Sequence, residues 1–153
     1  MPNVLLRFGI VVLASVVAGV TTLAAATLPS SSDAMASLLR DAIAKRDYES
    51  IAAVINWDGA GKIKRRVVAY SVRYGLGREV KSITVEPTDG EAIAATAKLN
   101  GKRLNMPVSH KVRVVYDEPP INGRAPTAVY LIGGGEAGWR IALVVRTGGR
   151  HGD

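Results

Sequence analysis

The spacing of the apolar residues changes once along this chain, near Gly77, and this change limits the folds that the chain can adopt. Before Gly77 the apolar residues recur at three-and-four spacing, which is typical of helices that bury one face. After Gly77 they alternate with other residues, which is typical of strands. Helices followed by successive strands predict an α+β domain, in which N-terminal helices pack on one face of an antiparallel sheet of four to five strands.

Three helices are predicted in the first half of the chain. The first begins at Asp33 with Ser32 as its cap, and the second is short and has Asp47 as its cap. The third runs from Lys62 to Tyr74, and at about 100° per residue four of its apolar residues fall within a narrow arc. These residues are Ile63, Val67, Tyr70 and Tyr74. We expect this arc to be the buried face of the third helix.

Five strands are predicted in the second half. Their expected positions are residues 80–85, 93–99, 108–116, 128–132 and 139–146. Thr88-Asp89-Gly90 is interpreted as the hairpin turn between the first two strands. The glycine-rich run from Gly133 to Gly138 is interpreted as the flexible loop of the last hairpin.

The first 26 residues have the layout of an export segment. Arg7 is followed by 19 residues without a charge, and Ala24 and Ala26 suit cleavage by a signal peptidase. After cleavage the mature chain would begin at Thr27. Without cleavage the segment is long enough to cross a bilayer as an anchor, with Arg7 on the cytoplasmic side. Both alternatives predict a domain outside the cytoplasm, in the periplasm or the extracellular space.

The remainder of the chain has the length of one domain. We expect a linker over residues 27–32, a single α+β domain over residues 33–146 and a flexible tail over residues 147–153. The chain contains no cysteine, so disulfides and a lipid-modified cysteine are excluded. The predicted domain is long enough to be stabilised by an apolar core alone.

No cofactor, metal ion or catalytic group is expected. Gly133, Gly135 and Gly138 have the spacing of a dinucleotide-binding motif, but a strand-like segment follows where that motif needs a helix. Two histidines without cysteine are too few to hold zinc. Ser109 and His110 are not expected to form a catalytic pair, because neighbouring residues of a strand point to opposite faces.

Carboxylates occur in close pairs that have a structural explanation. All of the pairs lie at predicted caps or turns, where acidic residues accept backbone hydrogen bonds or are solvated. The pairs are Asp47 and Glu49, Asp89 and Glu91, and Asp117 and Glu118. We therefore expect no paired-carboxylate site for acid–base catalysis.

Positive charge is concentrated in one segment. Residues 62–81 contain seven cations and one acid, and this excess of six equals the excess of the whole chain from Thr27 onward. Four of these cations lie beside the apolar arc of the third helix: Lys62, Arg65, Arg66 and Arg73. Such a run is either a solvated helix face or a contact surface for lipid headgroups, an envelope polymer or an acidic protein. Nucleic acid is not expected, because the chain is predicted to be exported and no aromatic platform interleaves the cations.

Two short stretches resemble a known family. Leu39 to Tyr48 (LRDAIAKRDY) is similar to the start of many exported domains of the nuclear transport factor 2-like superfamily. Gly138 to Ile141 (GWRI), after its glycine turn, is similar to the last hairpin of those domains. The resemblance implies a cone-like fold with a curved sheet wrapped by helices, often with a cavity and often dimeric. Cystatin-like exported domains share this helix-on-sheet plan and are the alternative.

Three functions fit these features. The first, which we favour because no catalytic motif is found, is a non-enzymatic exported module that binds a protein or an anionic envelope component through the basic helix. The second is a small-ligand-binding or isomerase-like or dehydratase-like cone with an internal cavity. Its candidate lining residues are Tyr70, Tyr74, Tyr116 and Tyr130. The third is a membrane-tethered structural subunit of an envelope complex. A membrane surface and a homodimer are further candidate partners.

Overall fold

The computed structural model describes residues 27–148, so the predicted export segment and the last five residues lie outside the described range. Three helices come first: α1 (Ser32–Lys45), α2 (Tyr48–Val54) and α3 (Lys62–Gly75). The remaining elements are β1 (Val80–Pro87), α4 (Gly90–Leu99), β2 (Lys102–Leu104), β3 (His110–Tyr116), β4 (Thr127–Gly135), β5 (Gly138–Ile141) and β6 (Val144–Arg146). The predicted α+β class is confirmed.

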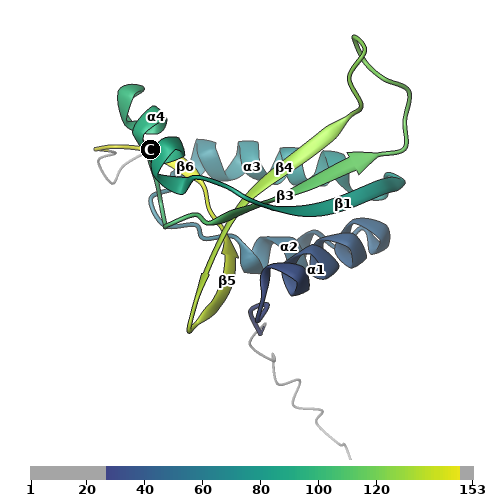
Figure 1. The fold of residues 1–153 in the computed structure, drawn as a ribbon, viewed down its shortest axis with the longest axis horizontal. Helices are drawn as coiled ribbons and strands as arrows, with labels where there is room; N and C mark the ends of the chain where they lie inside the picture. The colour runs from purple at the N-terminus through teal and green to yellow at the C-terminus, as the bar shows by residue number, and fades with distance from the viewer. Residues whose placement is uncertain (1–26, 149–153) are drawn as a thin grey trace, which may run out of the picture.

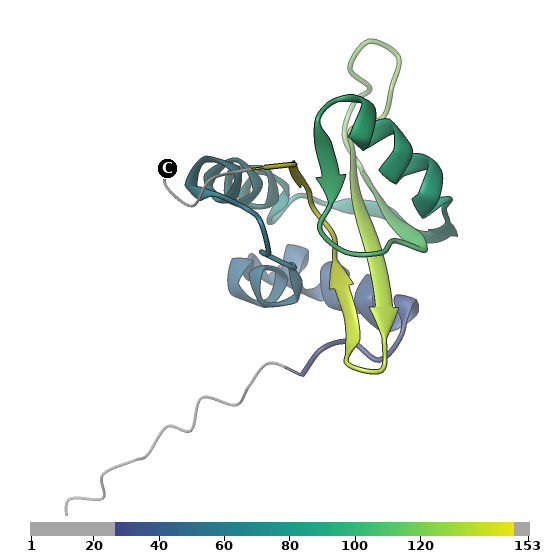
Figure 2. The same ribbon diagram turned by 90° about the vertical axis from the view of Figure 1, so that its left-hand side faces the viewer.

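Four strands form the main antiparallel sheet, in the order β1-β3-β4-β5, and β2 pairs with β6 in a separate two-stranded sheet. α1 contacts β1, β4 and β5, α2 contacts β5, and α3 contacts α2 (Figure 1). Figure 2 shows α2 and α3 on one side of the sheet and α4 on the other. α3 is therefore an outer helix, which packs beside α2 at the edge of the domain.

The first two helices begin close to their predicted caps. The hydroxyl of Ser31 accepts a hydrogen bond from the Ala34 amide at 3.0 Å, so the cap of α1 lies one residue before the predicted Ser32. Asp47 caps α2 as predicted and accepts a hydrogen bond from the Ser50 amide at 3.1 Å. Each cap satisfies a backbone donor that the first turn of a helix leaves free.

The apolar core lies between the main sheet and the helices α1 and α2. Its fully buried side chains come from both helices and from alternate residues of the strands. The largest are Met35, Leu39, Ile43, Ile51, Val54, Val112, Val114 and Ile132. The helical period of α1 and the two-residue period of β3 are thus confirmed.

Residues 93–99 form part of a helix, so the prediction of a second strand there is wrong. The carboxylate of Asp89 accepts a hydrogen bond from the Ala92 amide at 2.9 Å and starts α4. Thr88-Asp89-Gly90 is therefore a helix start and not a hairpin turn. Four of the ten residues of α4 are alanine, the strongest helix former, and this preference with the cap outweighs the weak alternation around Ile93.

The predicted last strand is two strands that belong to different sheets. β5 ends at Ile141 in the main sheet, and β6 begins at Val144 and pairs with β2. The predicted hairpin forms, but its loop is shorter than expected: β4 continues to Gly135 and pairs with β5, so only residues 136–137 form the turn. Gly133 is needed there, since a Cβ at this position would overlap the backbone carbonyl of Pro107.

Asn105 joins three connecting segments, a role that no sequence pattern predicts. Its side-chain oxygen accepts a hydrogen bond from the Leu143 amide at 2.8 Å. Its side-chain amide donates to the carbonyls of Asn56 and Asp58 at 2.6 and 3.1 Å. The β2–β3, β5–β6 and α2–α3 connections are thereby held together by one side chain.

The outer surface of the sheet carries a small ion cluster. Glu86 of β1 lies 3.0 Å from Arg113 and 3.1 Å from Lys111, both on the neighbouring β3. Hydrogen bonds from Arg113 and Lys111 lower the pKa of Glu86 to about 2. Glu86 is thus a shared acidic partner for both cations, whereas within residues 27–148 the cations of α3 described below have no acidic partner.

The two ends of the described range dock onto the fold. Pro29, within the predicted linker, is buried, and its carbonyl accepts a hydrogen bond from the Trp139 amide at 2.8 Å. Thr147, the first residue of the predicted tail, donates its hydroxyl proton to the Gly101 carbonyl at 2.7 Å. The longest helices of residues 27–148 have 14 residues, and none is long and apolar enough to span a bilayer.

Candidate functional site

α3 has two apolar faces, and the one with the smaller side chains is buried. Val72 and Gly75 are buried, and Val68 and Leu76 pack against the core. Gly75 allows this close approach, because a Cβ there would overlap the hydroxyl of Tyr116. At about 100° per residue, this face lies nearly opposite the arc that the sequence predicts to be buried.

The predicted buried arc is exposed, so that prediction is wrong. Ile63 is 73% exposed, Val67 54%, Tyr70 71% and Tyr74 64%. A helix at the edge of the domain buries one face, and two tyrosines would hold α3 farther from its neighbours than Val68 and Val72 do. Contiguous exposed apolar side chains of this kind mark interaction surfaces in soluble proteins.

These four residues form a single continuous row, which we name the α3 seam. Their spacing along the chain is four, three and four residues, the spacing of the a and d positions of a coiled coil. The rings of Tyr70 and Tyr74 stack, with centroids 6.5 Å apart and planes inclined by 26°. The other large apolar side chains exposed within residues 27–148 lie separately, at Leu99, Ile121 and Val129.

Cations lie beside the seam and have no acidic partners. Lys62 and Arg66 are exposed. Arg73 is also exposed, and its guanidinium is held 4.0 Å above the ring of Tyr48. Within residues 27–148 no cation of α3 forms an ion pair with a carboxylate. The helix therefore presents an uncompensated positive charge next to an uncovered apolar row.

Arg65 differs from the other predicted contact residues because its guanidinium is hydrogen-bonded to the backbone of the domain. Its Nε donates to the carbonyl of Ala60 at 2.9 Å, and its Nη2 donates to the carbonyl of Trp57 at 3.3 Å. The guanidinium also lies 5.3 Å from the centre of the Trp57 ring. Arg65 thus ties the start of α3 to the loop that precedes it.

The C-terminal end of the seam meets a neutralised arginine. Arg78 lies between Tyr74 and Tyr116, 5.1 and 4.0 Å from their ring centres, and pairs with both oxygens of Glu118 at 2.6 Å. This bidentate pair raises the pKa of Arg78 and lowers the pKa of Glu118. The free positive charge beside the seam accordingly ends at Arg73.

The four tyrosines considered as pocket residues do not face one cavity. Tyr70 and Tyr74 lie on the exposed seam. Tyr116 of β3 is buried in the core, and Tyr130 of β4 is half-buried against it. Burial raises the pKa of the Tyr116 and Tyr130 hydroxyls. They stay protonated at neutral pH and are poor candidates for a general base.

Ser109 and His110 lie closer together than predicted. The Ser109 hydroxyl is 3.0 Å from His110 Nδ1, because β3 begins at His110 and the strand alternation does not extend back to Ser109. The imidazole ring meets the edge of Trp139, with centroids 5.4 Å apart. Within residues 27–148 no carboxylate hydrogen-bonds to this histidine and no cluster of potential ligands could hold a metal ion.

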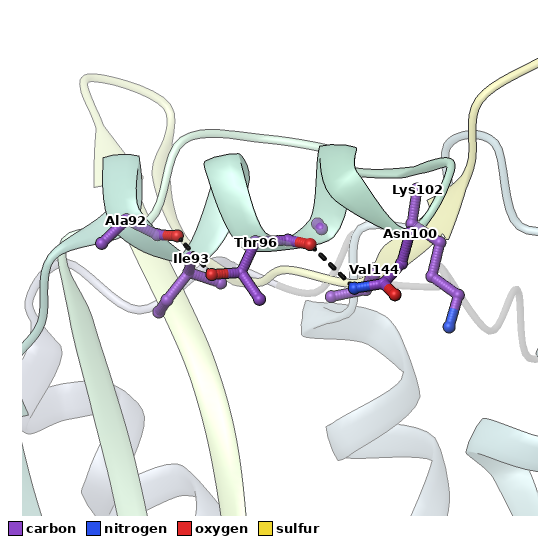
Figure 3. Close-up of a pocket in the computed structure, with 7 residues that line it drawn as sticks. Ala92, Ile93, Thr96, Asn100, Lys102 and Val144 are labelled. Atoms are coloured by element: carbon purple, nitrogen blue, oxygen red, sulfur yellow. Dashed lines mark hydrogen bonds between the residues drawn. The ribbon is translucent and has the colours of Figure 1, made fainter.

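A hollow lies between α4 and β6, with a volume of ≈ 410 Å³ (Figure 3). Ala92, Ile93 and Val144 give it a mainly apolar lining, and Lys102 is its one titratable residue. Thr96 and Asn100 donate their side-chain hydrogen bonds to carbonyls of α4 itself, as the dashed lines show. The hollow therefore holds no acid–base pair.

The geometry places the exposed apolar residues and the unpaired cations on the same helix, and this surface is the candidate site. Sequence reasoning found both sets of residues but assigned the apolar set to the core. No protein-family model matches this chain, and comparisons with curated proteins and with solved structures find no similar protein.

Proposed function

We propose that this protein is a non-enzymatic interaction module that binds an anionic partner through the α3 seam. The observation that carries the proposal is the exposure of four apolar side chains directly beside unpaired cations on one helix. Removing the apolar row from water supplies binding energy, and the cations attract and select a negative partner. Neither feature contributes to the core, so both are free to act in binding.

The rest of the described chain offers less support for a catalytic function. The tyrosines point in different directions, and the hollow beside α4 lacks an acid–base pair. The glycine run at Gly133 leads into β5 rather than into a helix, so it lacks the geometry that binds a pyrophosphate. A binding surface remains as the feature that the arrangement supports best.

Export belongs to the same proposal, with residues 1–26 as a cleaved signal or an uncut anchor. The membership in the nuclear transport factor 2-like superfamily also stays a proposal, supported by helices packed on an antiparallel sheet.

Mass spectrometry of the protein from its own cell distinguishes cleavage of residues 1–26 from their retention as an anchor. A first residue at Thr27 would support cleavage and overturn the tether, and an intact Met1 would support the anchor.

The binding proposal is tested with anionic probes at increasing salt. We expect the full-length protein to bind phosphatidylglycerol vesicles, polyglutamate or an acidic helical peptide, and to be released as salt screens the cations. Lys62→Glu with Arg66→Glu should abolish this binding. Lys98→Glu with Arg140→Glu makes the same charge change on α4 and β5 and should leave it nearly intact.

Arg65 and Arg73 are left unchanged in this test, because their contacts with Trp57 and Tyr48 would make a lost fold look like lost binding. Failure of every anionic probe would overturn the proposed function. Equal weakening by the two double variants would also overturn it, since it would show that net charge acts without the α3 surface.

A further inference from the structure

We infer that the partner of the α3 seam is an amphipathic helix with acidic residues beside its own apolar row. The inference rests on the proposed function and narrows it to one class of partner. Three observations carry it: the width of the seam, the identity of the residues that flank it, and the absence of acids from α3.

The seam has the width that fits a single helix. At about 100° per residue, Ile63, Val67, Tyr70 and Tyr74 span an arc of about 60°. A helix that lies in a membrane surface presents a much broader apolar face, whereas a coiled coil uses only its a and d positions. With Val67 and Tyr74 at a, and Ile63 and Tyr70 at d, the row continues without a break over two heptads.

The flanking positions specify the charge of the partner. In this register Lys64 and Ser71 occupy e positions, and Arg66 and Arg73 occupy g positions. Three of the four are cations, and the contact with Tyr48 already fixes Arg73 beside the seam. Residues at e and g pair with opposite charges across a helix–helix interface. The facing positions of the partner are therefore best filled by Glu or Asp.

A second copy of the same helix fits less well. α3 contains no acidic residue, so two copies packed seam to seam would bring cations against cations. The chain's own first 26 residues contain one charged residue, Arg7, and no acid, so they lack the complementary charge as well. The charge pattern accordingly favours a different chain.

The seam is open to such a partner along its length. From Ile63 to Tyr74 it extends about 16 Å at 1.5 Å per residue, which corresponds to three helical turns. α3 lies at the edge of the domain, and the sheet and α2 are on its inner side (Figure 2). At one end Arg78 is already paired with Glu118, so the cations left for a partner are those of α3.

The test uses a synthetic peptide of three heptads with Leu at a and d and Glu at e and g. One control peptide has the same composition with the Leu positions shuffled, and another has Lys in place of Glu. Titration calorimetry with the full-length protein should show binding of the first peptide only. Val67→Ser and Tyr70→Ser should each weaken it roughly tenfold, which corresponds to losing burial of about one exposed side chain.

Two single charge reversals distinguish a helical partner from a diffuse anionic surface such as a vesicle. Arg66 borders the seam at g, whereas Lys62 lies one position farther from it, at c. A helical partner should be weakened roughly tenfold by Arg66→Glu and much less by Lys62→Glu, since only neighbouring charges pair closely. A vesicle should respond about equally to both, because each cation adds a similar attraction to an anionic bilayer.

The outcomes separate this inference from the proposed function. Binding of phosphatidylglycerol vesicles or polyglutamate without the peptide would overturn the helical partner and leave the proposed function standing. Equal binding of the shuffled peptide would also overturn it. A dimer in sedimentation that Val67→Glu dissociates would show that a second copy covers the seam. Failure of all probes would overturn both proposals.

Discussion

The two faces of α3 can be compared by making one chemical change twice. Val67 is 54% exposed on the seam and Val72 is 4% exposed in the core, and both lie within the same helix. Replacing either by alanine removes the same atoms and gains the same helix propensity. The difference between the two variants in the free energy of unfolding therefore reports burial.

The expected magnitude follows from the exposed fractions. Valine to alanine removes two carbons, worth about 1.6 kcal/mol when fully buried, and a core site adds about 0.5–1 kcal/mol for the cavity. Helix propensity returns about 0.5 kcal/mol in each variant. We expect Val72→Ala to cost about 1.5–2 kcal/mol and Val67→Ala to cost about 0.2 kcal/mol.

Urea unfolding of the full-length protein, followed by the fluorescence of Trp57 and Trp139, measures this difference. The slopes of the two transitions should agree, so that the midpoints alone report stability. A loss at Val67 as large as that at Val72 would refute the exposure of the seam. If such a loss appears only at high protein concentration, the seam is covered by a second copy and the helical partner is refuted instead.

Three other features of the fold predict measurable effects. Gly133→Ala should cost about 2–4 kcal/mol in denaturant unfolding, because its Cβ would overlap a backbone carbonyl. In the control Gly135→Ala the new Cβ meets no atom within 4 Å, and the free energy of unfolding should change by less than about 0.5 kcal/mol. Equal effects of the two substitutions would contradict the pairing of the glycine run. Asn105→Ala should cost about 2–3 kcal/mol, because it leaves a backbone amide and two carbonyls without partners, and a loss below about 0.5 kcal/mol would show that water replaces them. Hydrogen bonds from Arg113 and from a lysine of β3 hold the pKa of Glu86 at about 2, below its ordinary value of 4.5. The ionised carboxylate therefore stabilises the fold above pH 4.5 and loses this effect as the pH falls toward 2. In Glu86→Gln the free energy of unfolding should accordingly fall less steeply between pH 4.5 and pH 2. An NMR titration midpoint of Glu86 near pH 4.5 would contradict the cluster.

Elements with two agreeing local features could be predicted from the sequence. α2 has both an aspartate cap and apolar residues at helical spacing, and both act as expected. In β3, Val112 and Val114 alternate with two charged residues and form the buried face. Where cap and periodicity point to the same element, tertiary packing has little to override.

The errors arose where the sequence offers two local solutions. Alternation around Ile93 favours a strand, but the Asp89 cap and the alanines favour a helix, and the helix forms. On α3 both arcs are apolar, and periodicity does not tell which one faces the core. The choice depends on how closely Gly75 lets the helix approach Tyr116, a contact between residues 41 positions apart that no local pattern contains.

The strength of the proposed α3 interaction can be bounded from the same exposed fractions. The four seam residues together expose the equivalent of about two and a half whole side chains, whose burial would release roughly 4–8 kcal/mol before any cost is counted. Association itself costs an estimated 4–15 kcal/mol, so the apolar row alone is too small for a permanent complex. Whether a complex forms then depends on the cations beside the row, because they attract a negative partner and speed its association in a salt-dependent way. A surface of this size and charge is suited to a reversible partner, and the measured affinity should fall steeply with salt for that reason.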